Sequence, residues 1–365
     1  MTKINLAYFI TSHGFGHASR ACAVMQAIQL SDPKVHFHIY TSIPDWFFYQ
    51  SLQETFTLHS IITDIGLVQK SPFEIDYPAT LEHLSLFYQE YEHKASQIHH
   101  EIKNLNVKII ISDISPLGIT IGNLANIPAI LIENFTWDWI YESYQTEFQG
   151  FKFFADTIRK TVSKANYHYL TEPFCQYPRS LDRIAKPITR KPTQQAETVK
   201  KQLAIPKDDK VILLSMGGIP DQIQINISSL EKKGITFIVP GIGTDIVRER
   251  STIFLPHHSN FYHPNLVSAS DAVIAKVGYS TIAEGYHAGV PMGYIPRPDF
   301  PESKYLSTYV KDKMGGIEIK LNEVLSGRWS DMIDQLLSIP KRNESRLNGA
   351  DQIAEWILAI LHSNG

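Results

Sequence analysis

The sequence predicts an α/β protein of two domains, and three observations support this prediction. The chain has 365 residues, which is about twice the length of a usual domain. Apolar runs of strand length alternate with segments of helix length, the pattern of parallel sheets covered by helices on both faces. The runs form two groups, separated by a stretch poor in large apolar side chains. We therefore expect two doubly wound parallel sheets, one in each half.

Four apolar runs predict the strands of the first sheet. Each is rich in Ile, Val, Phe or Tyr and is bounded by polar or turn-forming residues. The runs are 4–10 (INLAYFI), 35–41 (VHFHIYT), 107–112 (VKIIIS) and 128–133 (PAILIE). We expect them to form an N-terminal domain over residues 1–186.

A linker is predicted between the two groups of runs. Residues 185–197, AKPITRKPTQQAE, hold two prolines, clustered basic residues and almost no large apolar side chains. This composition disfavours a packed element, and we place the linker at residues 187–197.

Five further runs predict the second sheet, in a domain over residues 198–340. They are 210–216 (KVILLSM), 235–240 (ITFIVP), 252–255 (TIFL), 271–276 (DAVIAK) and 291–296 (PMGYIP). In the last segment, 341–365, Ile353, Ile357 and Ile360 share one helical face. This segment is therefore predicted to be a helix that packs on a domain surface.

The composition favours an enzyme with a small-molecule partner. Hydrophobic residues make up 43% and charged residues 19%, and the formal net charge of −3 lacks the basic excess of a nucleic-acid binder. Cys22 and Cys175 are too few for a disulfide framework or a cysteine zinc site and fit a reducing compartment. No stretch approaches the roughly 18 apolar residues of a membrane span, and the N-terminus lacks the pattern of a signal peptide. We expect a cytoplasmic location; the sequence carries no signal for the oligomeric state.

Both halves open with a strand that runs into a glycine-bearing turn. The first is INLAYFITSHGFGH and the second is VILLSMGG, which ends in Gly217 and Gly218. Ligands of open α/β sheets bind beyond the carboxyl ends of the strands. Two such domains facing across a cleft would form one site. Gly217 and Gly218 would lie on the side of this cleft that the second domain forms.

The first turn, GFGHAS at residues 14–19, predicts a ligand site at the start of a helix. It nearly fits the G-x-G-x-x-G dinucleotide fingerprint, with Ser19 in place of the third glycine. The second strand, however, ends without the acidic residue that would hold the ribose of a nicotinamide cofactor. Gly14 and Gly16 instead let an oxygen-rich or anionic group approach the helix N-terminus.

His17 is the candidate general base of this turn. An imidazole held by a carboxylate can take a proton from a hydroxyl group near neutral pH, and Asp113 follows a strand that should end at the same sheet edge. The alternative is structural, with His17 capping the helix or filling the turn and Asp113 starting the next helix. His13 is an auxiliary candidate for which a structural role is favoured, and Arg20 either neutralises a ligand or pairs with a neighbouring carboxylate.

Aromatic clusters at 45–50, 86–91 and 135–144 are candidates for contact with an acceptor. Trp137 lies in the third. Most such rings belong to a hydrophobic core. The histidines of HFH (36–38) share a strand face, but without a third ligand they do not predict a zinc site.

The second candidate site lies in AKVGYSTIAEGYHAGVPMGYIPRPDFPES, residues 275–303. A strand should end at Lys276, which lies near the phosphates of a ligand or is solvated. Gly278 allows close backbone approach, and Ser280 and Thr281 open a helix, a geometry suited to phosphate.

Glu284 follows Thr281 at the spacing of a capping box, which needs no ligand. Alternatively, its carboxylate accepts hydrogen bonds from two ribose hydroxyls. Spacing alone favours the capping box.

Together these segments resemble glycosyltransferases of the GT-B fold, which consists of two Rossmann-like domains. GFGHASR resembles the glycine-histidine turn of plant-type UDP-glycosyltransferases, of the N-acetylglucosaminyltransferase of peptidoglycan synthesis and of nucleotide-sugar hydrolases of nonulosonic acid synthesis. The resemblance implies that His17 is the catalytic base and that Asp113, in IISDISP, orients it. GYSTIAEGYHAGVPMGYIP resembles the donor signature, which implies that Ser280 and Thr281 touch the diphosphate and Glu284 the ribose.

The chain is also similar to the glycosyltransferase-like region of plant L-arabinokinases and its stand-alone bacterial relatives. The similar pieces are SHGFGHASR, NFTWDWIY (134–141), HPNLVSASDAVIAKVGYSTIAE (263–284) and RPDFPES (297–303). The last piece adds Asp299 and Glu302 to the implied donor site. The sugar kinase domain of that family has no counterpart among these segments.

Two departures from the plant donor signature concern the sugar and the base. Glu302 is followed by Ser303 where the signature has a sugar-binding glutamine, which leaves the sugar open. PHHSNFYHP and AKVGYS lack the usual tryptophan and histidine. Uracil remains the expected base.

We therefore expect a glycosyltransferase that moves a sugar from a nucleotide-diphosphate sugar, a UDP-sugar, to a hydroxyl acceptor with inversion. The nucleotide sugar would be a co-substrate and no separate cofactor is expected. The sequence lacks the D-x-D motif that holds a metal under a sugar diphosphate, so we expect metal independence. The alternatives are a nucleotide-sugar hydrolase in which His17 activates water, and a non-catalytic sugar-nucleotide-binding module.

Overall fold

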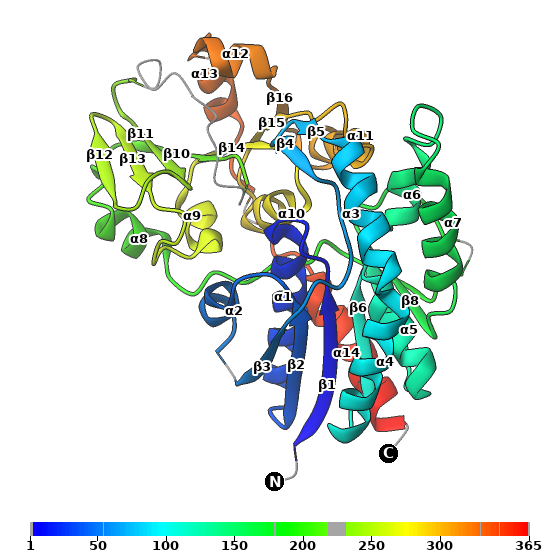
Figure 1. Ribbon diagram of the computed structural model, residues 1–365. Coiled ribbons are helices and arrows are strands. Elements are labelled where there is room, and N and C mark those ends of the chain that lie inside the picture. Colours follow the sequence, from blue (N-terminus) through cyan, green and yellow to red (C-terminus); the bar gives the residue numbers. More distant parts are fainter. Residues whose placement is uncertain are drawn as a thin grey trace. The chain divides into compact units, whose positions relative to one another are not determined.

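The computed structural model describes residues 3–53, 55–178, 180–217, 231–328, 330–342 and 344–363. The chain divides into two compact units (Figure 1). The first unit comprises Met1–Lys70, Glu74–Thr189 and Leu347–Gly365, and the second comprises Ser71–Phe73 and Arg190–Arg346. The final segment of the chain thus belongs to the first unit.

The first unit is built on a seven-stranded parallel sheet in the order β3-β2-β1-β6-β7-β8-β9. Its strands are β1 (Ile4–Ile10), β2 (Val35–Thr41), β3 (Phe56–Ser60), β6 (Ile109–Asp113), β7 (Ala129–Glu133), β8 (Tyr167–Thr171) and β9 (Arg183–Ala185). A two-stranded sheet pairs β4 (Gln69–Ser71) with β5 (Glu74–Ile75). Because the strand order reverses beside β1, the carboxyl ends of β1 and β6 form the kind of edge at which α/β proteins bind ligands.

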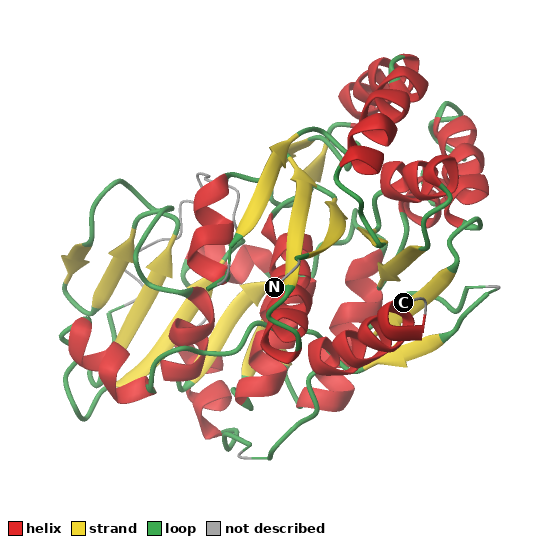
Figure 2. Ribbon diagram, turned by 90° about the horizontal axis from the view of Figure 1, so that it is seen from below, coloured by secondary structure: helices red, strands yellow, loops and turns green. Residues whose placement is uncertain are grey.

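Helices cover both faces of this sheet, as Figure 2 shows. They are α1 (Phe15–Ser31), α2 (Asp45–Ser51), α3 (Tyr77–Gln89), α4 (Tyr91–Asn104), α5 (Pro116–Ala125), α6 (Trp137–Glu142), α7 (Phe151–Val162) and α14 (Gly349–Ser363). Side chains alternate across β1: Leu6 and Tyr8 join the core under α1, α2 and α14, whereas Ala7 and Phe9 join the core under α4 and α5. This alternation explains why β1 is apolar from Leu6 to Ile10.

Helix α14 belongs to the core of the first unit. It packs against α1, and Ile353, Ile357 and Ile360 are buried in the cluster that also contains Ala18 and Ala21. One helical face is thus buried at the spacing that the sequence shows.

The second unit holds another seven-stranded sheet, in the order β12-β13-β11-β10-β14-β15-β16, in which β12 alone among these strands runs antiparallel to its neighbour. The strands are β10 (Lys210–Ser215), β11 (Ile235–Pro240), β12 (Val247–Glu249), β13 (Thr252–Leu255), β14 (Ala272–Lys276), β15 (Met292–Ile295) and β16 (Ile317–Glu318). The helices are α8 (Ala196–Gln202), α9 (His263–Ala269), α10 (Tyr279–Ala288), α11 (Glu302–Tyr309), α12 (Leu321–Ser326), α13 (Ser330–Ser338) and the π-helical turn η2 (Val310–Met314). Two hydrophobic clusters, one on each face, hold this sheet.

The α/β prediction is confirmed, and the predicted strands all coincide with observed ones. The inner strand β8, which is mostly buried, and the short strands β4 and β5 were not predicted. The edge strands β3, β9, β12 and β16 were missed as well, and these are half-exposed or shorter than the predicted runs. Isolated edge strands of two to five residues lack the long apolar pattern on which such predictions depend.

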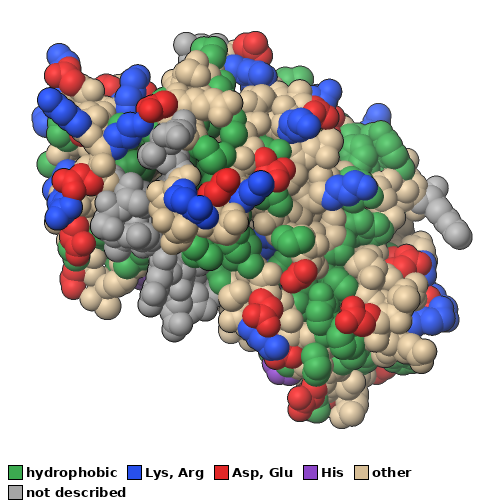
Figure 3. All heavy atoms as spheres, turned by 90° about the horizontal axis from the view of Figure 1, so that it is seen from above, with side chains coloured by type: hydrophobic (Ala, Val, Ile, Leu, Met, Phe, Trp, Pro, Cys, Tyr) green, Lys and Arg blue, Asp and Glu red, His purple; other side chains and the backbone are tan. Residues whose placement is uncertain are grey.

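The surface agrees with the nearly balanced charge of the sequence. On the face shown in Figure 3, acidic and basic side chains are interspersed among apolar and neutral ones, and the described side chains form no large patch of one sign. No helix in the described ranges is both long enough and apolar enough to cross a membrane.

Candidate active site

The glycine turn after β1 positions the start of α1. Gly14, the N-cap of α1, has φ +71°, a backbone conformation that side chains with a Cβ rarely adopt. Gly16 follows within the first turn and is partly exposed. This geometry directs His17, the third residue of the helix, to the edge where β1 ends.

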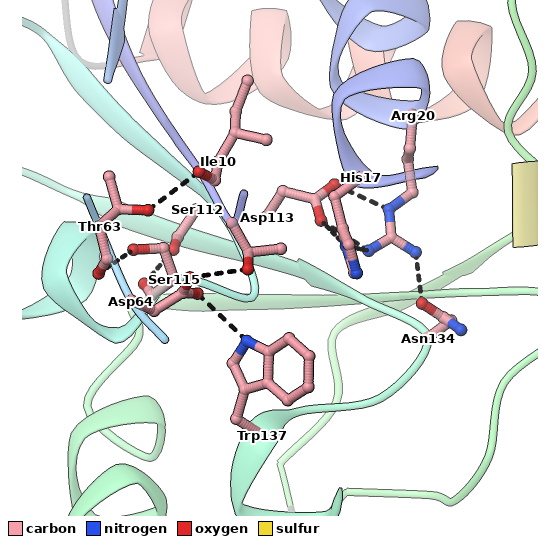
Figure 4. A network of polar contacts seen from close by, with 11 residues as sticks. Ile10, His17, Arg20, Thr63, Asp64, Ser112, Asp113, Ser115, Asn134 and Trp137 are labelled. Atoms are coloured by element: carbon pink, nitrogen blue, oxygen red, sulfur yellow. Dashed lines mark hydrogen bonds and ion pairs between the residues drawn. The ribbon is translucent and has the colours of Figure 1, made fainter. Parts of the chain in front are cut away.

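His17 contacts Asp113 at that edge (Figure 4). Asp113 is the last residue of β6 and lies in register with Ile10, the last residue of β1. His17 Nδ1 and Asp113 Oδ1 are 2.7 Å apart, and both side chains are buried. A carboxylate only accepts hydrogen bonds, so Nδ1–H is the donor and the lone pair of the imidazole is on Nε2. The predicted pair is thus brought together in the geometry of an oriented base.

Arg20 completes this cluster. Its Nε donates to Asp113 Oδ2 and its Nη2 to Asp113 Oδ1, both at 2.7 Å, and its Nη1 donates to Asn134 Oδ1 at 2.6 Å. Arg20 is 1% exposed and Asp113 is fully buried. The sequence left open whether Arg20 neutralises a ligand or pairs with a neighbouring carboxylate, and the structure shows the pairing with a carboxylate. Asn134, directly after β7, is a further partner of Arg20 that the sequence analysis did not single out.

The charges of the cluster set the protonation of its members. Burial raises the pKa of Asp113, but the charge and hydrogen bonds of Arg20 and the hydrogen bond of His17 outweigh burial and hold it below its ordinary range. Burial lowers the pKa of His17, and Asp113 only partly reverses this effect. His17 is therefore neutral at neutral pH and can accept a proton.

Two aromatic rings stand beside His17. The ring centroids of Phe135 and Trp137 lie 5.7 Å and 6.5 Å from that of His17. Trp137 is 1% exposed, and its Nε1 donates to Asp64 Oδ2 at 3.2 Å. Trp137 is therefore a buried wall of the site.

Asp64 is a buried carboxylate that the sequence analysis missed. Its Oδ1 accepts from Thr11 Oγ1 at 2.7 Å, and its neighbour Thr63 donates to the carbonyl of Ile10 at 2.9 Å (Figure 4). Burial raises the pKa of Asp64 to about 7, against the lowering effect of the hydrogen bonds from Thr11 and Trp137. Asp64 follows the unpredicted strand β3, so no sequence signal connected it with the site.

His13 holds the loop that follows β3. Its Nδ1 accepts from the backbone N–H of Leu67 at 3.3 Å, and its Nε2 lies 3.0 Å from Gln69 Nε2. Gly66 approaches so closely that a Cβ there would lie 2.5 Å from His13 Nδ1. These contacts agree with the structural role that the sequence favours.

In the second unit, Glu284 is the centre of a buried polar cluster. It lies on α10 and is 4% exposed. Its Oε1 accepts from Arg190 Nη2 at 3.0 Å, and its Oε2 lies 2.5 Å from His263 Nδ1. His263 Nε2 in turn lies 3.0 Å from Ser215 Oγ at the end of β10. Burial raises the pKa of Glu284, but His263 and Arg190 outweigh burial and lower it.

These contacts exclude the capping-box alternative. The N-cap of α10 is Gly278, with no side-chain hydrogen bond to the cap, so Thr281 and Glu284 do not cap the helix together. Arg190 and His263, which the sequence analysis did not single out, lie far from Glu284 along the chain.

Lys276 and Gly217 meet at the carboxyl edge of the second sheet. Gly217 has φ +91°, and a Cβ there would lie 2.4 Å from Lys276 Cε. Burial, with the charge of Arg297, lowers the pKa of Lys276 to about 7, whereas Glu302 raises it. Ser280 and Thr281 lie in the first turn of α10 beyond Gly278. Gly218 lies outside the described residues.

The remaining predicted donor residues lie where β15 runs into α11. Asp299 is exposed, and Glu302 is the first residue of α11 and half-buried. Between them and the sheet, Arg297 is buried, donates from Nε to the carbonyl of Pro72 at 2.8 Å and stacks on Phe300. The sequence analysis did not single out Arg297.

A cavity of about 580 Å³ opens in the second unit after β13. Its walls include Gln194, Pro256, His258, Asn260 and Phe261. They combine apolar and ring surfaces with amide groups, a chemistry suited to a flat polar ring. Among the described residues, no group of three or more His, Cys, Asp or Glu side chains is arranged to hold a metal ion.

A family model described as glycosyl transferase family 1 matches residues 4–336. L-arabinokinase of Arabidopsis thaliana is 26% identical over 359 residues, which cover 96% of this chain and 34% of that protein. The chain thus spans about a third of the curated relative's length.

Solved structures of glycosyltransferases share the fold. The calicheamicin glycosyltransferase CalG4 matches with a TM-score of 0.67 and 12% identity over 99% of both chains. UGT89C1 of Arabidopsis thaliana, in complex with UDP, matches with a TM-score of 0.63 and 13% identity over 99% of this chain and 100% of that chain. With the two parallel-dominated sheets, these similarities establish the GT-B fold.

Proposed function

The chain belongs to glycosyl transferase family 1, and from this premise we propose that it transfers a sugar from a UDP-sugar to a hydroxyl group of an acceptor, with inversion at the anomeric carbon. The observation that carries this proposal is the buried contact between His17 Nδ1 and Asp113 Oδ1, which leaves Nε2 as a proton acceptor. A carboxylate that fixes the tautomer of a neutral histidine is the arrangement that general base catalysis requires.

The proposed reaction is a single displacement. The acceptor hydroxyl gives its proton to His17 Nε2 while its oxygen forms a bond to the anomeric carbon. The bond from that carbon to the diphosphate oxygen breaks, and its electron pair leaves with the nucleotide. Attack from the face opposite the leaving group inverts the configuration. Asp113 stabilises the imidazolium that forms.

The second unit supplies the groups for the donor. Lys276 and the N-terminus of α10, with Gly278, Ser280 and Thr281, offer positive charge and hydrogen-bond donors for a diphosphate. We also assign Gly217 and Gly218 to the diphosphate site, where their backbone N–H groups would act as donors. A bound diphosphate would raise the lowered pKa of Lys276 and favour its charged form, which would stabilise the leaving group without a metal ion.

Glu284 is proposed to bind the ribose. Its oxygens accept from Arg190 and His263, and a carboxylate has about four lone-pair positions in total. The remaining positions suit two ribose hydroxyls. We place the base in the cavity near His258 and Phe261, and the sugar near Asp299 and Glu302. The UDP in the UGT89C1 complex supports uracil as the base.

The test uses His17→Ala with a panel of UDP-sugars and acceptors. Loss of the base should lower kcat about 10²–10⁴-fold, while calorimetry should show unchanged binding of UDP. His100→Ala, on the surface of α4, is the matched control and should transfer at the wild-type rate. Full turnover by His17→Ala would contradict the assignment. Free sugar formed at the same rate without acceptor would identify a hydrolase instead.

The donor side has a separate test. Glu284→Ala should weaken UDP binding, because the ribose loses its acceptor. Binding of UDP to the wild type should also raise its apparent stability. A wild-type protein that binds UDP but turns over no UDP-sugar would support the non-catalytic alternative.

A further inference from the structure

A cluster of histidines joins the edge strand β3 to β2 and α4 in the first unit. In the parallel pairing of the two strands, Tyr40 lies in register with His59 and His38 with Thr57, so these side chains share one face of the sheet. The rings of Tyr40 and His59 are stacked, with centroids 4.2 Å apart. Glu101 of α4 closes the cluster: its Oε1 accepts from the Tyr40 hydroxyl at 3.0 Å and lies 2.8 Å from His59 Nδ1.

The contact between His38 and His59 depends on their protonation. His38 Nδ1 and His59 Nε2 are hydrogen-bonded at 3.2 Å, so one nitrogen donates and the other accepts. The Glu101 carboxylate favours a proton on the Nδ1 of His59, which leaves Nε2 as the acceptor and makes Nδ1–H of His38 the donor. A change of tautomer in His38 accommodates one added proton. With two added protons, both rings carry a charge and direct N–H groups at each other.

The surroundings of this pair oppose a charge on His38. The ring of His36, on the same strand, has its centroid 5.1 Å from that of His38, and Lys3 precedes β1. Burial lowers the pKa of His38 to about 4, and the charges of the neighbouring histidines and of Lys3 add to this effect. Glu101 favours a charged His59, but burial outweighs it and lowers the pKa of His59 as well. Both histidines are therefore neutral in the folded protein at neutral pH.

The pair lies where β3 joins the rest of the sheet. Among the described strands, β3 pairs with β2 alone, and its residues are half-exposed or exposed. The segment that follows, residues 61–68, lies against the candidate active site. Thr63 Oγ1 donates there to the carbonyl of Ile10 at 2.9 Å, and Asp64 accepts from Trp137 Nε1 at 3.2 Å. Release of β3 would therefore free one end of a segment that supports the wall of this site.

We propose that the pair of His38 and His59 is a pH-sensitive switch: in mild acid, protonation of both rings detaches β3 from β2 and loosens residues 61–68. The closed arrangement disfavours a second proton, whereas opening of β3 exposes both rings to water, where each binds a proton readily. Protons therefore shift the equilibrium towards the open form. This switch goes beyond the transferase proposed above and does not depend on it.

The size of the effect follows from the two states of His38. In the open form its pKa returns to the ordinary 6.5, and in the closed form it is about 4. The open form thus binds one more proton between these values, so the closed form is most stable above pH 6.5 and loses stability as the pH falls. For His38 alone, the equilibrium constant for opening should rise about 20-fold from pH 7 to pH 5.

Hydrogen exchange of the wild type, followed by mass spectrometry at pH 7 and pH 5, tests the switch. Protection factors, which correct for the pH dependence of chemical exchange, should fall about 20-fold in residues 56–60 and also fall in residues 61–68. They should not change in the inner strand β7, residues 129–133. Equal protection of β3 at both pH values would overturn the proposal, and so would an equal fall in β7, which would indicate global unfolding. Unchanged protection of residues 61–68 would overturn the link to the candidate active site.

The variant His38→Asn assigns the effect to the pair. An asparagine amide can donate to His59 in place of Nδ1–H but does not titrate, so the fall in β3 protection should be at least 5-fold smaller than in the wild type. His100→Ala, on the exposed surface of α4, is the control and should keep the wild-type fall. A fall in His38→Asn as large as in the wild type would overturn the proposal. If this variant does not fold, the wild-type measurement still decides.

Discussion

Asp64→Asn tests whether the carboxyl group behind Trp137 is neutral in the folded protein. Burial raises the pKa of Asp64 from its ordinary 3.8 to about 7. The folded protein therefore binds a proton at Asp64 between about pH 4 and pH 7, whereas the unfolded chain does not. The free energy of unfolding must then fall as pH rises through this window. At about 1.4 kcal/mol for each pKa unit, the loss is about 4 kcal/mol.

The assay is urea unfolding of wild type and variant at intervals from pH 4 to pH 8. An asparagine does not titrate, so the variant should lack this loss, and the difference in stability between the two proteins should change by about 4 kcal/mol across the window. Any constant cost of the substitution cancels in this comparison. A Thr11→Val variant serves as the second arm, because it removes the 2.7 Å hydrogen bond that lowers the pKa. In Thr11→Val, the fall in the free energy of unfolding should continue to a higher pH than in the wild type.

The result that refutes the reasoning is a stability difference between wild type and Asp64→Asn that stays constant from pH 4 to pH 8. Such a result would mean that Asp64 is ionised in the folded protein at pH 5. The hydrogen bonds from Thr11 and Trp137 would then lower the pKa of Asp64 by more than burial raises it.

Further predictions concern the buried ion pair and one glycine. Asp113→Asn should lower the free energy of unfolding by about 3–5 kcal/mol, because Arg20 would stay buried without the carboxylate that it pairs with. Unchanged midpoints of urea unfolding would contradict this prediction. Gly289→Ala should be more destabilising than Gly243→Ala in the same assay. Both have positive φ, +64° and +73°, which costs a residue with a Cβ about 1–2 kcal/mol. Only at Gly289, of these two, would the Cβ also overlap a backbone atom, the carbonyl oxygen of Arg342 at 1.8 Å; equal losses in the two variants would contradict this.

The contact between His17 and Asp113 could be predicted from sequence because one rule places both residues. His17 follows β1 and Asp113 ends β6, and neighbouring parallel strands present their carboxyl ends at one edge. Lys276 and Gly217 meet for the same reason, at the ends of β14 and β10. The positions of the predicted strands were therefore sufficient to predict these two contacts.

The partners that were missed come from segments without a periodic pattern. Arg190 lies in the predicted linker, 94 residues from Glu284, and His263 begins a helix two elements earlier. Asp64 follows β3, whose half-exposed residues do not read as a strand. Tertiary packing brings these groups together, and no local propensity encodes such long-range contacts.

The return of the chain to the first unit has a consequence for synthesis on the ribosome. Residues from Arg190 to Arg346 are made after most of the first unit and before α14. Until α14 leaves the exit tunnel, the nascent first unit lacks Ile353 and Ile357. The apolar side chains that these two residues cover remain exposed until then. The inserted unit, whose residues are nearly all contiguous, can complete its own core earlier. A stop codon just before α14 would therefore damage the unit synthesised first and spare the one synthesised later.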